Sequence, residues 1–155
     1  MPLKYQKTYI TLIIAAHDQY DTGDFQEAIV LAQTASELFA EQVFDYLFAK
    51  RDVQYLQGPV ERLLYRNFSL AHSKVVGLYE ALSDDRLTQQ AIWSQYKEHT
   101  ELRNDIVHQG REIDAAQAKR SLQIVEDLIK HIGEATGLSD ALPENIIPIH
   151  RSSAH

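Results

Sequence analysis

The sequence contains no cysteine, and among its 155 residues only four are proline and six are glycine. Without cysteine the chain can form neither a disulfide nor a thiolate metal site, and this composition is compatible with a reducing compartment. The few prolines and glycines fall between periodic apolar segments, which favours helices over a many-turned β architecture. Internal repeats are missing too, so a tetratricopeptide-type scaffold has no support beyond the short stretch Gly23–Ala28.

Long apolar runs are missing as well. The apolar run Tyr9–Ala16 contains Thr11, and it leads into His17 and Asp18 rather than into a small-residue cleavage site. We therefore expect no signal peptide. No stretch approaches the roughly 20 apolar residues that are needed to cross a bilayer. The sequence predicts a cytoplasmic protein that has no membrane partner.

Positive charge is in deficit, since 15 Lys and Arg residues face 22 Asp and Glu residues and the net charge is −7. Proteins that follow a nucleic-acid groove are usually basic, because phosphate contacts supply most of their affinity. The acidic balance counts against a broad nucleic-acid footprint but leaves room for a small, locally positive site. Hydrophobic residues (45%) and charged residues (24%) occur at ordinary globular levels, and the length fits one domain.

Hydrophobic periodicity predicts five helices. The clearest is the second, where apolar residues recur at steps of three and four and Asp24 is the expected N-cap. In the first segment, the β-branched residues are also compatible with a strand, but the 3.6-residue period of Tyr9, Ile13 and Ala16 favours a helix. The five predicted ranges are Leu3–Tyr20, Phe25–Ala49, Pro59–Leu82, Arg86–His108 and Asp114–Ala135.

Turn chemistry predicts where these helices begin and end. Pro59 is expected to open the third helix, Ser83–Asp85 to cap the fourth, and Gly110 to end it. The inner face of the third helix is expected to consist of Leu63, Leu64, Phe68, Ala71, Val75, Leu78 and Leu82. The expected fold is an all-α, up-and-down bundle of four to five helices. One domain spans residues 1–137, and an irregular tail spans residues 138–155.

The segment 103–108, with the sequence RNDIVH, carries the candidate chemistry. Arg103 and His108 lie five residues apart, so about 140° separates them on an ideal helix and they do not share a face. Asn104 and His108 are four apart and do share one. On spacing alone, His108 is a cation at a helix C-terminus and Arg103 is a surface or salt-bridge residue.

The stretch Leu102–Gly110 closely resembles the signature of HEPN domains, in which Arg and a polar residue are followed by three more residues, then by His, and soon by Gly. The context is similar: Trp93 and Tyr96 precede the motif, and a long amphipathic helix follows it. Most of residues 3–136 fit the all-helical layout of that family. The resemblance implies a HEPN-like bundle and, as in many members, a metal-independent endoribonuclease that acts as a homodimer.

The resemblance implies catalytic roles for Arg103, Asn104, His108 and Glu37. Cleavage of RNA by its own 2′-hydroxyl needs a base and an acid, and histidine suits both roles because its unperturbed pKa is about 6.5. Arginine suits a phosphate that gains charge in the transition state. Asn104 would orient His108 or bind a phosphate oxygen, and Glu37 would hold Arg103. Solvent-exposed roles for Asn104 and Glu37 remain open as alternatives.

The remaining features narrow this interpretation. In the HEPN toxins that are paired with a nucleotidyltransferase antitoxin, a tyrosine is modified two residues after the motif histidine, and Gly110 occupies that position here. Asp105 and Glu101, which flank the motif, are expected to be solvated or paired within the helix. The other histidines form no compact ligand set, so we expect no metal and no cofactor.

Two functions follow from the resemblance. The first is a homodimeric ribonuclease, a toxin or defence effector, whose partners are a second copy, RNA and an antitoxin or regulatory protein. The second is a non-catalytic HEPN-like module for dimerisation or for binding a protein or nucleotide. The acidic charge favours the second function, and the motif favours the first.

Overall fold

The computed structural model describes residues 6–138 and residue 141. The described chain is all-helical and contains no strand, which confirms the predicted class. The prediction of four to five helices was wrong, because the described ranges contain six α-helices. These are α1 (Gln6–Asp21), α2 (Phe25–Lys50), α3 (Gln57–Leu63), α4 (Ser73–Ser83), α5 (Ala91–Gln109) and α6 (Ala115–Thr136), with 3₁₀ helices η1 (Gln54–Leu56) and η2 (Leu87–Gln89). None of the described helices is both long and apolar enough to cross a membrane.

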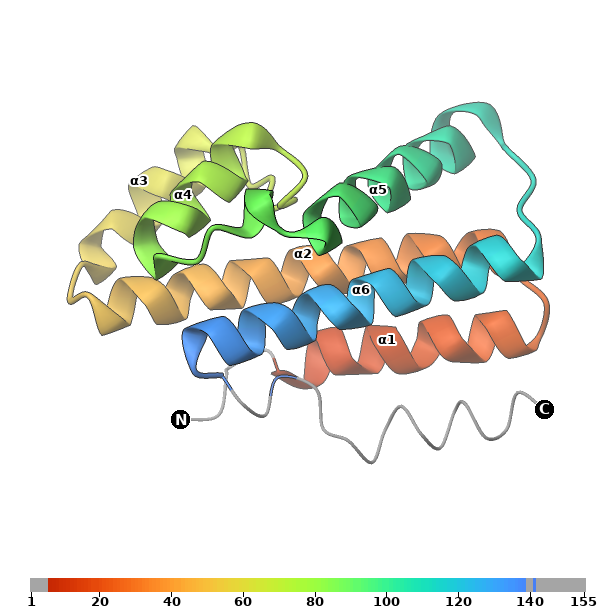
Figure 1. Ribbon diagram of the computed structural model, residues 1–155, viewed down its shortest axis with the longest axis horizontal. Coiled ribbons are helices and arrows are strands. Elements are labelled where there is room, and N and C mark those ends of the chain that lie inside the picture. The colour runs from red at the N-terminus through yellow and green to blue at the C-terminus, as the bar shows by residue number, and fades with distance from the viewer. Residues whose placement is uncertain (1–5, 139–140, 142–155) are drawn as a thin grey trace.

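Helix α2 is the centre of the molecule and contacts every other α-helix of the described chain. The helices α1, α2 and α6 lie side by side and form a first layer (Figure 1). Above it, α3 and α4 cover the C-terminal half of α2, while α5 runs obliquely over α2 and α6. The second layer is therefore divided into two parts, and both parts rest on α2.

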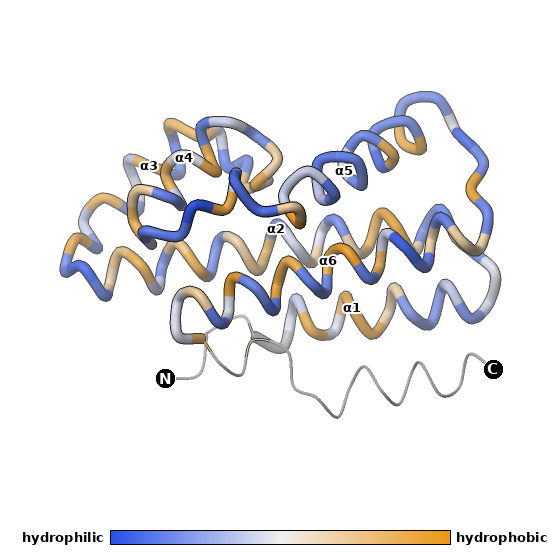
Figure 2. The backbone as a smooth tube through the Cα atoms, in the orientation of Figure 1, coloured by the Kyte–Doolittle hydropathy of each residue, from blue (hydrophilic) through white to orange (hydrophobic). Residues whose placement is uncertain are grey.

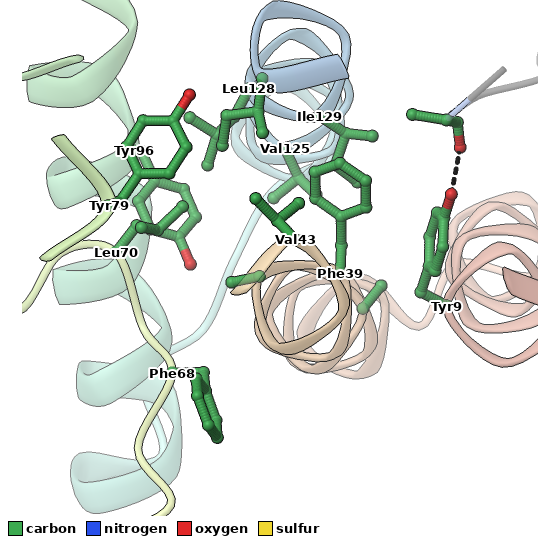
Figure 3. Close-up of a cluster of buried hydrophobic side chains, with 14 of the residues drawn as sticks. Tyr9, Phe39, Val43, Phe68, Leu70, Tyr79, Tyr96, Val125, Leu128 and Ile129 are labelled. Atoms are coloured by element: carbon green, nitrogen blue, oxygen red, sulfur yellow. Dashed lines mark hydrogen bonds between the residues drawn. The ribbon is translucent and has the colours of Figure 1, made fainter. Parts of the chain in front are cut away.

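The core lies mainly between the three helices of the first layer. Phe39 and Val43 of α2 point toward Val125 and Ile129 of α6, and Tyr9 of α1 lies beside them (Figure 3). The Tyr9 and Phe39 rings make an edge contact with centroids 5.1 Å apart. Alanines at four buried positions of α2 allow the neighbouring helices to approach closely; they are Ala28, Ala32, Ala35 and Ala40.

Caps fix several of the predicted helix ends. The Asp24 carboxylate accepts a hydrogen bond from the Glu27 amide, as expected for an N-cap. At α6, Asp114 and Gln117 form a reciprocal capping box. Gly110 ends α5 in the left-handed conformation at φ 65°, where a side chain would be strained.

The predicted third helix, Pro59–Leu82, was wrong, because the chain forms two short helices there. Helix α3 ends at Leu63, and Tyr65 and Arg66 both adopt left-handed backbone, with φ of 51° and 57°. Helix α4 then begins at Ser73. Pro59 is the third residue of α3 instead of the first, and Leu63, expected on the inner face, is 73% exposed.

Local hydrogen bonds explain this break. The Asn67 side chain accepts from the Ser69 amide, the Ser69 hydroxyl accepts from the Ala71 amide, and His72 Nδ1 accepts from the Lys74 amide. Such bonds satisfy backbone donors outside a helix, so they compete with helix formation. Phe68 is still buried, but it enters the core from this loop and packs on Phe44 with ring centroids 5.8 Å apart.

The start of the predicted fourth helix was also wrong. Residues 87–89 form the separate helix η2, and α5 begins only at Ala91, with Gln90 as its N-cap. The expected cap at Ser83–Asp85 instead ends α4, where Asp84 is left-handed with φ 61°. The helix therefore reaches the motif as predicted, but it starts five residues later than expected.

The residues after α6 partly fold back on it. Leu138 and Ala141 are buried, and the Tyr9 hydroxyl donates a hydrogen bond to the Ala141 carbonyl (Figure 3). Gly133 permits this approach, because an added Cβ would lie 2.7 Å from the Leu138 carbonyl oxygen. The rest of the predicted tail of residues 138–155 lies outside the described residues.

Candidate functional site

A cavity of about 610 Å³ opens between α2, the loop of residues 64–72 and α5. Arg103 and Asn104 line it from α5, and Glu37 lines it from α2. Three of the four predicted site residues therefore meet at one place. The volume lies in the range of sites for small ligands. Helix α5, which supplies the motif, carries mostly hydrophilic residues, unlike α2 beneath it (Figure 2).

An ion pair joins the two helices at this cavity. One Nη atom of Arg103 lies 3.6 Å from Glu37 Oε1, which confirms the predicted pairing of these residues. Both side chains are partly exposed, so the pair adds little to stability and its main effect is to orient the guanidinium. Arg103 Nε is buried, and no hydrogen-bond partner for it exists among the described residues.

Buried polar groups continue this pair into the protein. The Gln33 amide nitrogen donates to Glu37 Oε1 at 3.2 Å, and Gln33 Oε1 lies 3.0 Å from His99 Nε2. Because Glu37 only accepts hydrogen bonds, Gln33 must present its oxygen to His99, and His99 Nε2 must carry the proton. The chain of contacts thus runs from His99 through Gln33 and Glu37 to Arg103.

His99 is neutral in this network. Burial, together with the smaller effect of the nearby Arg103 charge, lowers the pKa of His99 to about 3. Its Nδ1 atom is buried without a partner in the described part of the chain. Arg103 Nε and His99 Nδ1 are thus a donor and an acceptor one turn apart on α5, and both lack partners there. An unpaired buried polar group costs about 1–3 kcal/mol.

His108 lies apart from these residues. It is exposed in the last turn of α5 and does not line the cavity. The reason is the orientation of α5, since Ile106 faces inward and packs on Ile29 and Ala118. With Ile106 inside, Arg103 turns toward the cavity and His108 toward solvent. One chain therefore does not bring Arg103 and His108 together.

The loop supplies cavity residues that sequence reasoning missed. Arg66 and His72 line the cavity together with Arg103. His72 is the N-cap of α4, and its Nδ1 atom accepts a hydrogen bond from the Lys74 amide. The ring proton is therefore on Nε2. Residues 67–69 (Asn-Phe-Ser) offered a signal in their capacity for local side-chain hydrogen bonds, but apolar periodicity outweighed it.

The cavity carries charges of both signs. Its lining includes the acidic residues Glu37 and Glu41 and the basic residues Arg66 and Arg103. Burial raises the pKa of Glu41, the nearby Glu61 raises it further, and the Arg66 charge acts in the opposite direction. A ligand that suits this lining therefore offers hydrogen-bond donors as well as an anionic group.

Several other polar residues considered in the sequence form ion pairs outside the cavity. Asp105 pairs with Arg111 at 3.0 Å, just beyond the end of α5. His131 Nε2 lies 2.8 Å from Asp85 and ties α6 to the turn after α4, and His17 pairs with Glu126 between α1 and α6. Within the described ranges, no group of three or more His, Asp or Glu side chains could hold a metal ion.

Comparisons with known proteins add no family to this description. No model of a known protein family, no curated protein and no solved structure matches the chain. The resemblance to HEPN domains therefore depends on the 102–110 motif and on the order of the helices.

Proposed function

We propose that this chain is a metal-independent endoribonuclease of the HEPN type that acts as a homodimer with HEPN-like helical protomers. The observation that carries the proposal is the placement of Arg103 and His108. Glu37 orients Arg103 at the wall of a cavity, and His108 is solvent-accessible near the end of the same helix. The biological role that fits this activity is that of a toxin or defence effector, restrained by an antitoxin or regulatory protein.

The proposed chemistry uses the 2′-hydroxyl of the RNA as the nucleophile. Its oxygen attacks the adjacent phosphorus, its proton passes to a histidine, and the departing 5′-oxygen receives a proton from a second histidine. Arg103 stabilises the negative charge that develops on the phosphate. Asn104, which lines the cavity one turn before His108, binds a phosphate oxygen or orients the imidazole.

A second copy of the chain is needed for this chemistry. One protomer supplies one His108, and the fold turns it away from Arg103. Two protomers that meet along α5 supply two imidazoles and two guanidiniums at one phosphate. Val107, which is 53% exposed beside His108, gives this part of the helix an apolar contact.

RNA cleavage in EDTA tests the proposal. We expect the purified protein to cut RNA, and Arg103→Ala or His108→Ala to reduce the rate at least about 100-fold, the usual scale for losing acid–base catalysis. Arg120→Ala and Gln109→Ala are matched controls, because Arg120 lies in an exposed ion pair and Gln109 is the exposed neighbour of His108. Cleavage by both motif variants at the wild-type rate would exclude the motif as the active site.

The second candidate function is a non-catalytic module that binds a nucleotide or a protein. The observation that favours it is the cavity itself, which is lined by both charge signs and does not include His108. This function predicts a stable oligomer by light scattering and no cleavage of RNA at high protein concentration. Cleavage that depends on His108 would exclude it.

A further inference from the structure

The cavity beside the motif is better suited to a nucleobase than to a bare phosphate. Its four charged side chains, Glu37, Glu41, Arg66 and Arg103, sum to no net charge, whereas a phosphate site needs an excess of cations. Glu37 is already paired with Arg103. Glu41 remains as a carboxylate at the cavity wall that can accept hydrogen bonds from a ligand.

An aromatic ring borders the same cavity. Tyr65 lines it and is 91% exposed, and its left-handed backbone holds it just after the end of α3. Exposed aromatic rings next to a polar pocket are the usual platform on which an unstacked RNA base rests. Arg66, the next residue, lines the cavity with its guanidinium and suits a phosphate of the same nucleotide.

From these features we propose that the cavity binds one guanine nucleotide of the RNA strand, with Glu41 accepting from the base and Tyr65 stacking on it. Guanine is the base that places two adjacent N–H donors, N1–H and the N2 amino group, on its Watson–Crick edge. One carboxylate accepts both. This inference rests on the proposed ribonuclease function, and it makes the cavity the part of the site that selects where the strand is cut.

Binding of short RNAs tests the proposal without cleavage. In the full-length His108→Ala chain, which retains the cavity, we expect the tetranucleotide UUGU to bind at least about tenfold more tightly than UUUU, as measured by calorimetry. Glu41→Gln should abolish this preference, and Tyr65→Ala should weaken the binding of UUGU. Arg66→Ala should weaken the binding of both RNAs by the same factor, because a contact to phosphate does not distinguish one base from another.

The controls separate a local effect from a loss of folding. Glu134→Gln on α6 makes the same chemical change far from the cavity, and it should leave both affinities unchanged. All variants should keep the wild-type melting temperature within a few degrees. Equal affinity for UUGU and UUUU, or a preference that survives Glu41→Gln, would overturn the proposal. Binding of free guanosine monophosphate without any preference among the RNAs would also overturn it, because the ligand would then be the free nucleotide.

Cleavage of the same RNAs by the wild-type chain distinguishes the two proposals. If UUGU is bound selectively but neither RNA is cut, the ribonuclease fails and the guanine site stands. If both RNAs are cut in a His108-dependent manner but bind equally, the ribonuclease stands and the guanine site fails.

Discussion

The first layer and the segment from α3 to η2 are built on different physical principles. In α1, α2 and α6, apolar residues recur with the helical period and bury a shared core. Between residues 57 and 90, short helices alternate with turns that side-chain hydrogen bonds hold, and two large hydrophobic side chains, Leu63 and Tyr65, remain exposed. Periodic burial therefore determines the helices of the first region, whereas in the second region local polar contacts set the turns from which residues such as Phe68 and Leu70 reach the core.

The largest difference between the regions should appear when a core ring is removed. Phe39→Ala leaves a cavity between α1, α2 and α6, and we expect it to lower the free energy of unfolding by about 3–5 kcal/mol. The control in the second region is Leu63→Ala, whose side chain is 73% exposed. Its effect should stay within about 0.5 kcal/mol. Urea denaturation of both variants measures the contrast, and equal losses would contradict it.

The buried polar network between α2 and α5 should make stability depend on pH. His99 has a folded pKa of about 3, so only the unfolded chain takes up a proton as the pH falls below about 6.5. The unfolding free energy is therefore unaffected above that pH and should decrease below it, by up to about 1.4 kcal/mol per pH unit. His99→Gln, which keeps a donor for Gln33, should flatten this decrease in urea titrations between pH 7 and pH 5.

A smaller effect should follow from removing a cap in the second region. His72→Ala removes the acceptor for the Lys74 amide at the start of α4, and it should lower the unfolding free energy by about 1 kcal/mol. His72→Asn should restore stability, because asparagine is a good N-cap. Thermal melts compare the three proteins, and a failure of asparagine to restore stability would show that the His72 ring acts through packing instead.

The same contrast explains which parts of the fold the sequence could predict. The second and fifth predicted helices match α2 and α6 to within about a residue at each end. Apolar stripes such as Ile29, Phe39 and Val43 follow the helical period and fit no strand. Phe68 shows the limit of this reasoning. It fits a helical stripe with Leu64 and Ala71, but it is buried from a loop whose turns depend on Asn67 and Ser69.

In the candidate site, too, the residues on helices were easier to predict than the residues on the loop. The pairing of Glu37 with Arg103 was expected only from the resemblance to HEPN domains, and the contact between α2 and α5 brings the two side chains within reach of each other. Arg66 and His72 were missed, since their place depends on the loop. The separation of Arg103 from His108 was visible as a helical angle, but the direction in which each points depends on the packing of Ile106.

The left-handed backbone at Arg66 has a consequence for laboratory evolution. Glycine adopts φ near 57° without the cost of about 1–2 kcal/mol that a residue with a Cβ incurs. A library screened only for heat resistance should therefore enrich Arg66→Gly, whereas a library screened for RNA capture should retain arginine. Enrichment of glycine in the first library and retention of arginine in the second would show that residue 66 accepts backbone strain in exchange for binding a ligand.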